Sequence, residues 1–126
     1  MARKKSTTLT EAEVRLMDVL WARGASTVND VLAAMPGQPR LAYSTVLTTL
    51  RILEDKGYLS HQKEGRAFLY VPQVRREQVQ KSVLRILLSR FFENSAEQLV
   101  LNVLKHEKLD ALELRRLRRM IHEAEK

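Results

Sequence analysis

Hydrophobic residues recur at helical spacing between residues 41 and 56, and this stretch organises the rest of the chain. Val46, Leu50 and Leu53 stand at positions i, i+4 and i+7, so they share one side of a helix. Gly57 follows at the position where glycine commonly ends a helix. The other side of this predicted helix carries short hydroxyl and charged side chains: Ser44, Thr45, Thr48, Arg51 and Asp55.

Two shorter helices are predicted ahead of this stretch. A Thr-x-x-Glu capping box opens a helix at Thr10, and Gly24 ends it. Thr27 with Asp30 repeats the capping pattern before a second helix, which the turn at residues 36–39 terminates. We expect the second helix to brace the helix at 41–56, as in a helix-turn-helix. The predicted apolar sides are Val14, Met17, Val19, Leu20 and Trp21 in the first helix and Val28, Val31, Leu32 and Met35 in the second.

A β-hairpin is predicted directly after the helix at residues 41–56, which we call the central helix. Residues 59–71 alternate moderately between polar and apolar side chains, and Gly65 permits a tight turn with positive φ between two short strands. Phe68 and Tyr70 share one strand face, which we assign to the core. Residues 25–27 form a short extended link that we expect to pair as a third strand.

Three more helices are predicted after residue 75, with N-caps at Ser95 and Asp110. They carry more apolar surface than such a short helical segment can bury within itself, and exposed apolar surface is costly. We therefore expect burial against a second copy, in a homodimer; the alternative is packing back on the N-terminal domain. The candidate dimerisation residues are Leu87, Phe91, Leu99, Val100, Val103, Leu104, Leu117 and Ile121.

These elements define a fold class that is mainly α with a small β-hairpin. The sequence predicts a winged helix-turn-helix N-terminal domain over residues 1–74, followed by a helical dimerisation region over residues 75–126.

Composition limits the cellular setting of the protein. There is no apolar run long enough for a transmembrane helix, so no membrane insertion is expected, and the basic start MARKKSTTLTEAE lacks the apolar region of a secretory signal. The chain has no cysteine, which excludes disulfides and thiolate metal sites and is compatible with a cytoplasmic location. No motif indicates a cofactor or a metal.

Charge points to a polyanionic partner. The formal net charge is +7. Residues 1–76 hold 12 of the 22 Lys and Arg side chains but only 7 of the 15 Asp and Glu, so they account for +5 of it. The excess therefore lies mostly in the half that contains the central helix, although a charge that only favours solubility is the alternative. Arg3, Lys4 and Lys5 form a basic tail that is either a phosphate contact or a solvated terminus.

The polar face of the central helix suits a DNA groove. Small polar side chains let a helix approach base edges and phosphates closely. Leu41 and Ala42, the candidate N-caps, are poor capping residues, which leaves early N–H groups available to a phosphate or to the hydroxyls of Ser44 and Thr45. Tyr43 lies either against the DNA backbone or against the proline-containing turn.

Cations gather near the predicted hairpin turn. Lys63 and Arg66, with His61 nearby, suit contact with phosphates or the minor groove. The alternative is edge protection, since Lys and Arg discourage strand pairing. Because these cations lie beside the central helix in the predicted fold, we favour DNA contact over edge protection.

The chain resembles the penicillinase and methicillin-resistance repressor family in LTEAEVRLMDVLW, TVLTTLRILEDKGYL, HQKEGRAFLYVP, RFFENS and LVLNVL, which together span most of residues 9–105. The resemblance implies a homodimeric winged-helix repressor that binds double-stranded DNA at a palindromic operator and blocks transcription. It assigns base reading to Ser44, Thr45 and Thr48, and phosphate contacts to Tyr43, Arg51, Lys63 and Arg66.

The resemblance also implies a route of regulation. In antibiotic-responsive members, a membrane sensor-protease pathway cuts the repressor at an Asn-Phe bond in the C-terminal region. The matching pair here is Asn102-Val103, with Val103 in place of the Phe. Copper-responsive relatives carry paired C-terminal cysteines, and a chain without cysteine lacks that mode.

Three other classes of function are alternatives to a repressor. A winged-helix protein-interaction module would bind without the steep salt dependence of phosphate neutralisation. A ligand-sensing transcriptional regulator would need a small-molecule pocket, to which no residue cluster points. An enzyme has poor support, because His61, His106 and His122 lack ligand spacing and no Gly-rich phosphate loop occurs.

Overall fold

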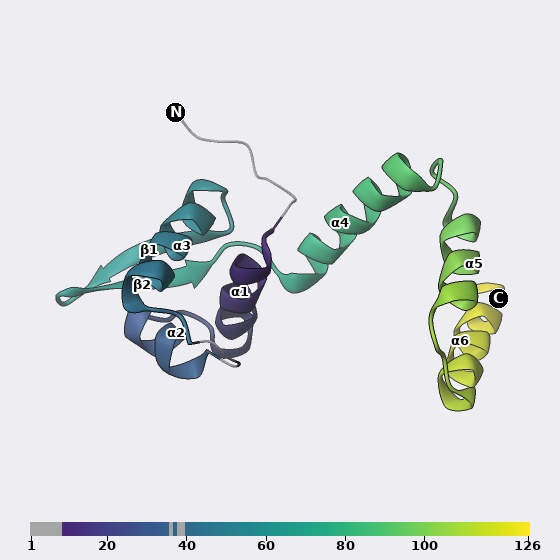
Figure 1. Ribbon diagram of the computed structural model, residues 1–126, viewed down its shortest axis with the longest axis horizontal. Coiled ribbons are helices and arrows are strands. Elements are labelled where there is room, and N and C mark those ends of the chain that lie inside the picture. The colour runs from purple at the N-terminus through teal and green to yellow at the C-terminus, as the bar shows by residue number, and fades with distance from the viewer. Residues whose placement is uncertain (1–8, 36, 38–39) are drawn as a thin grey trace. The chain divides into compact units, whose positions relative to one another are not determined.

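The computed structural model describes residues 9–35, 37 and 40–126 (Figure 1). Within them the chain is mainly helical with one small antiparallel hairpin, as predicted. The basic tail and most of the proline-containing turn lie outside the described residues. The elements are α1 (Glu11–Arg23), α2 (Val28–Ala34), α3 (Tyr43–Asp55), β1 (Leu59–Glu64), β2 (Ala67–Pro72), α4 (Arg76–Phe91), α5 (Ala96–His106) and α6 (Ala111–Ala124).

The contacts divide the chain into two compact units, one reaching to Val83 and one beginning at Leu84. This division falls within α4, whereas the sequence predicts a domain boundary after residue 74, which stays a prediction. No helix in the described part of the chain is both long and apolar enough to cross a bilayer.

Both predicted capping boxes are present in the first unit. At α1 the Glu13 backbone N–H donates to the Thr10 hydroxyl over 3.1 Å, and the Thr10 N–H donates to the Glu13 carboxylate over 2.7 Å. Thr27 and Asp30 repeat the exchange at α2, over 3.1 and 3.0 Å. These reciprocal bonds satisfy N–H groups that the first turn of a helix otherwise leaves unpaired.

The core of this unit lies where α1, α2, α3 and the base of the hairpin meet. Its centre is formed by fully buried apolar side chains: Leu16, Met17, Leu20, Val31, Val46, Leu50 and Leu53. All but Leu16 come from the apolar sides that the helical spacing predicts. One assignment was wrong. Val14 is 38% exposed, whereas Leu16, which the sequence pattern left out, is fully buried, so the buried side of α1 is displaced around the helix from the predicted one.

The hairpin pairs Leu59 with Pro72 at its base and Glu64 with Ala67 beside the turn. Gly65 in the turn has φ +62°, which residues with a β-carbon rarely adopt. Ser26 forms an isolated bridge to Tyr70, with N···O distances of 2.9 and 2.8 Å, so the expected third-strand pairing of residues 25–27 is confirmed as a single bridge.

The predicted core face of the hairpin is only half correct. Tyr70 is buried, but Phe68 is 45% exposed. Residues 61–68 are all exposed, so the hairpin extends beyond the core after its base, and Phe68 lies on this extended part.

An ion pair fixes the end of α3 against α1. The ammonium of Lys56 lies 2.8 Å from the carboxylate of Glu13, whose side chain is 4% exposed. Burial alone raises the pKa of Glu13, but the Lys56 ammonium and the hydrogen bonds with Thr10 outweigh burial, so its pKa is lowered. Gly57 then reverses the chain with φ +91°.

The start of α4 is held against α1 by polar contacts. The indole N–H of Trp21 donates to the Val74 carbonyl over 2.9 Å. The guanidinium of Arg76 lies over the Trp21 ring, 4.8 Å from its centroid, and also pairs with Asp18 at 2.8 Å. Trp21 is partly buried against the core, on the side that the sequence predicts.

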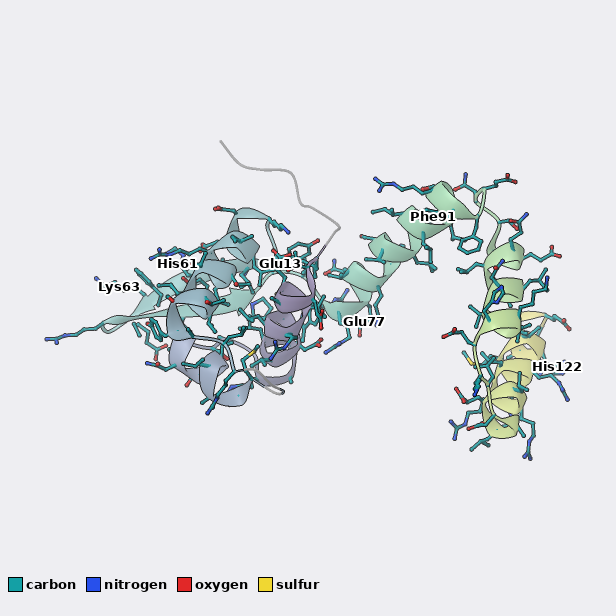
Figure 2. All side chains as sticks on the ribbon, in the orientation of Figure 1. Glu13, His61, Lys63, Glu77, Phe91 and His122 are labelled. Carbon is teal, nitrogen blue, oxygen red and sulfur yellow. The ribbon has the colours of Figure 1, made fainter. Side chains whose placement is uncertain are left out.

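The second unit contains the end of α4 with α5 and α6. Ser95 caps α5 and Asp110 caps α6, as predicted. None of the described residues of α4, α5 and α6 is buried. Of the candidate dimerisation residues, Leu87 and Leu99 are half-buried, and the exposed ones are Phe91 (labelled in Figure 2), Val100, Val103, Leu104, Leu117 and Ile121.

Candidate nucleic-acid interface

The candidate interface begins with the outward side of α3. Ser44, Thr45 and Thr48 are all exposed, with Arg51 and Asp55 on the same polar surface. The opposite side is buried in the core and includes Thr49, whose hydroxyl donates to the Thr45 carbonyl over 2.7 Å. The buried side of α3 anchors the helix in the core. Its short polar side chains on the other side form an outward surface that a DNA groove can accommodate.

The first turn of α3 is uncapped, as the sequence predicts. Ala42 occupies the N-cap position and no side chain bonds the free N–H groups there. The observed helix begins at Tyr43 and ends at Asp55, slightly inside the predicted range. Unpaired N–H groups at a helix start attract anions through their partial positive charge.

A groove of about 530 Å³ lies between the start of α2, α3 and the hairpin. It brings together three of the four predicted phosphate contacts, Tyr43, Arg51 and Arg66, which come from two different elements. Glu64 and the exposed Phe68 also line it, so the side chain misassigned to the core belongs to this groove. The arrangement offers cations and a phenol hydroxyl along one concave surface.

Lys63, the fourth predicted phosphate contact, is not among the residues that line the groove. It is exposed on β1 opposite Phe68, near the turn of the hairpin (Figure 2). Lys63 and Arg66 therefore lie on the same projecting end of the hairpin.

A buried tyrosine lies beneath this surface. Burial raises the pKa of Tyr70, and the charge of Glu54 raises it further, while the Arg51 guanidinium acts in the opposite direction. The hydroxyl therefore stays neutral and lies close to Arg51, which joins the base of the hairpin to the polar side of α3.

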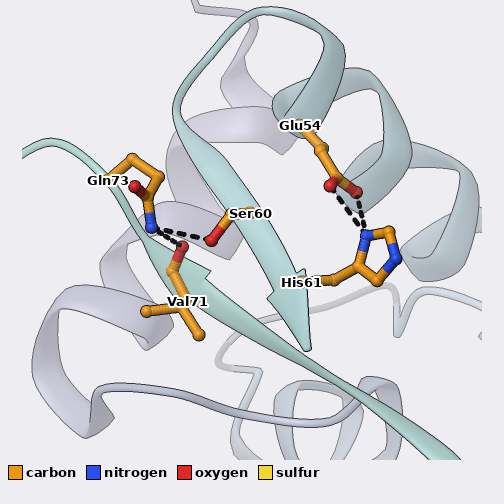
Figure 3. Close-up of polar contacts among 5 residues, drawn as sticks. All are labelled: Glu54, Ser60, His61, Val71 and Gln73. Carbon is orange, nitrogen blue, oxygen red and sulfur yellow. Dashed lines mark hydrogen bonds and ion pairs between the residues drawn. The ribbon is translucent and has the colours of Figure 1, made fainter. Parts of the chain in front are cut away.

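Two polar contacts on the hairpin were not predicted from the sequence (Figure 3). The Nδ1 of His61 lies 2.7 and 2.8 Å from the two carboxylate oxygens of Glu54, and the amide of Gln73 donates to Ser60 over 2.7 Å. Neither pair has a sequence signature, because the contacts depend on how β1 packs beside α3 and how β2 ends. His61, although exposed, is therefore bonded to a side chain of α3.

The described residues contain no group of three His, Cys, Asp or Glu side chains able to hold a metal ion. The polar chemistry of this region is instead that of hydroxyls, cations and free N–H groups, which are the partners of phosphates and base edges.

Comparison with known proteins identifies the chain. The family model described as penicillinase repressor matches residues 9–123. The chain belongs to the penicillinase repressor family. It is 29% identical over 120 residues to the penicillinase repressor of Bacillus licheniformis, covering 95% of this chain and 94% of that protein. It is 32% identical over 122 residues to the transcriptional regulator BlaI of Mycobacterium tuberculosis (strain CDC 1551 / Oshkosh), covering 96% and 88%.

A solved structure supports the fold of the first unit. The solution structure of the DNA-binding domain of the repressor BlaI superposes with a TM-score of 0.52 and 32% identity, covering 59% of this chain and 90% of that domain. This penicillinase repressor family member is therefore a winged-helix, DNA-binding transcriptional repressor and not an enzyme. The family assignment and the fold class predicted from the sequence are confirmed.

Proposed function

We propose that this protein acts as a homodimer on a palindromic operator, with α3 in the major groove and the hairpin against the flanking backbone. The observation that carries the proposal is the geometry of one surface: the exposed hydroxyls of α3 adjoin a groove containing Tyr43, Arg51 and Arg66. Hydroxyls suit base edges, and guanidinium groups suit phosphates.

The proposed roles divide by position on this surface. Ser44, Thr45 and Thr48 read base edges, because they are short and exposed on the protruding side of α3. Tyr43 and Arg51 contact phosphates from the groove. Lys63 and Arg66 contact the backbone from the end of the hairpin, where both are exposed.

Exposed apolar surface in the second unit supports the homodimer. Leu101, Leu104 and Phe91 are at least 47% exposed, although large apolar side chains rarely gather on the surface of a stable monomer. A two-fold dimer presents two copies of α3, and half-sites about 34 Å apart on one face of the duplex match that symmetry.

Relief of repression by cleavage in the C-terminal region is part of the proposal. Asn102 and Val103 lie inside α5, and the Asn102 amide donates to the Gln98 carbonyl over 2.9 Å. A protease binds an extended chain, so cutting this bond requires α5 to unwind first. A cytoplasmic location, with access to a membrane sensor-protease pathway and to DNA, belongs to the same proposal.

The test is footprinting of the full-length protein on the DNA upstream of its own gene. We expect two protected half-sites related by two-fold symmetry, and affinity that falls steeply as salt rises. Protection of a single asymmetric site would contradict the palindrome. Binding that is insensitive to salt would favour a protein-interaction module.

A further inference from the structure

His61 and Glu54 join the hairpin to the last part of α3 (Figure 3). The imidazole Nδ1 lies within 2.8 Å of both carboxylate oxygens. A carboxylate only accepts hydrogen bonds, so Nδ1 carries the proton and donates it. The two side chains are 43% and 27% exposed, so the contact is partly shielded from water.

The imidazole of His61 also contacts aromatic side chains of β2. It packs against the Phe68 ring with centroids 4.8 Å apart and faces Tyr70 at 6.0 Å. His61 pairs with Tyr70 across the hairpin and Lys63 pairs with Phe68, and directly paired residues share a sheet face. Lys63 therefore follows His61 on the same face of β1, and His61 is the residue that contacts Glu54.

The hairpin needs such a contact because it extends beyond the core. A hairpin of two strands is marginally stable alone, and residues 61–68 are exposed. Its base is fixed by buried Leu59 and Tyr70. Outward of that base, the pair with Glu54 ties β1 to α3 immediately before the end that carries Lys63 and Arg66.

We propose that Glu54 and His61 are positioning residues for DNA binding: their contact holds the hairpin at a defined angle to α3. Base contacts by α3 and backbone contacts by Lys63 and Arg66 are then made together, without ordering the hairpin at the moment of binding. A contact formed before binding lowers the entropy cost of association. This inference rests on the proposed function and adds a role that neither residue has in it.

The first experiment measures affinity of the full-length protein for operator DNA by fluorescence anisotropy. Glu54→Ala and His61→Ala each weaken binding roughly 3- to 10-fold, and the double variant is no weaker than either one, as for a coupled pair. Glu54→Gln stays close to wild type, because its amide oxygen accepts the same hydrogen bond. Gln62→Ala is the matched control, since Gln62 is the exposed neighbour on the other sheet face and leaves affinity unchanged.

The second experiment repeats Glu54→Ala in a Lys63→Ala/Arg66→Ala background. The effect of Glu54→Ala on affinity disappears there, because a hairpin without its cations no longer contacts the backbone. An effect of unchanged size would mean that Glu54 acts through α3 alone and would overturn the proposal. If wild type binds the operator and neither single variant weakens it, the proposal fails while the proposed function stands.

The third experiment works without DNA and does not depend on the proposed function. Hydrogen exchange of the free protein is followed in wild type, Glu54→Ala, His61→Ala and Gln62→Ala. We expect faster exchange of hairpin amides in the two pair variants alone, with α1 and α2 unchanged. Hairpin exchange equal to wild type would overturn the positioning role even if no operator were bound.

Discussion

At the scale of single residues, the polar side of α3 and the adjoining groove are defined by charged and hydrogen-bonding side chains. Arg51 and Arg66 come from different elements, yet both line one groove beside the exposed hydroxyls of α3. Glu13 and Lys56 also pair opposite charges, but their role is structural. Their ion pair is partly shielded from water and fixes the end of α3.

Arg66 tests the phosphate assignment. Arg66→Ala removes a cation at the hairpin turn without disturbing the core, since the side chain is exposed. We expect weaker binding to all DNA sequences alike, and a slope of log K against log salt reduced by about 1. Titrations at several salt concentrations, on operator and unrelated DNA, measure both effects. A change confined to base preference would contradict this assignment.

Glu13 tests the pH dependence of folding. Its pKa is lowered below 4.5 in the folded chain, so the carboxylate stabilises the fold above that pH, and the contribution is lost as pH falls through the folded pKa. Glu13→Gln keeps a capping-box side chain but loses the ion pair, and should lower the free energy of unfolding at pH 7 by about 1–2 kcal/mol.

Urea denaturation at pH 7 and between pH 3 and 5 measures this. The variant should lose less stability on acidification than wild type does. Glu11→Gln is the control, because Glu11 lies exposed in the same first turn of α1. An acid response of Glu13→Gln equal to that of wild type would count against the Glu13–Lys56 pair.

At the scale of elements, α3 combines two requirements that oppose each other. Its buried side fixes it in the core, whereas its first turn follows the N-cap residue Ala42, which provides no side-chain hydrogen bond. A good cap would stabilise the helix but would occupy N–H groups that a phosphate can use. The missing cap is therefore understandable if the start of α3 meets the DNA backbone.

Ala42→Asp separates these two requirements. Asp at the N-cap should raise the free energy of unfolding by roughly 0.5–2 kcal/mol, as capping residues do. The same change should weaken operator binding, because it adds a negative charge where a phosphate approaches. Thermal unfolding and anisotropy measure the two effects, and Ala42→Ser is the uncharged control. Higher stability with unchanged affinity would exclude a phosphate at this helix start.

At the scale of the whole molecule, the two units differ in how far they satisfy their own apolar surface. The first unit buries a core shared by three helices and the hairpin. The second has no buried residue in its described helices, and its exposed side chains include several leucines and valines and the ring of Phe91. The proposed homodimer would cover this apolar surface and so stabilise the second unit.

Leu117 tests the association. Leu117→Asp places a charge on the apolar side of α6 and should weaken the dimer by at least about 30-fold, as a central interface residue does. Operator affinity should fall with it, because two half-sites are then no longer bound by one linked molecule. Sedimentation velocity measures the dimer, and circular dichroism checks that helix content is kept. Arg119→Asp is the control, two positions along and on the opposite side of α6. A wild-type protein that sediments as a stable monomer would contradict the dimer.

Local structure could be predicted from the sequence because its causes lie within a few residues. A capping box joins positions three apart, and helical stripes repeat every three or four, so α1, α2, α3 and the exposure of Ser44, Thr45 and Thr48 followed from the pattern alone.

Contacts between distant residues were decided only by the tertiary structure. Alternation placed Phe68 and Tyr70 on one strand face but could not tell where along the hairpin the core ends, so only Tyr70 is buried. The groove that joins Arg51 to Arg66, and the pair of Glu54 with His61, depend on how the hairpin packs beside α3. Local pattern specifies which side of an element is apolar, whereas packing decides which neighbour that side meets and how far the contact extends.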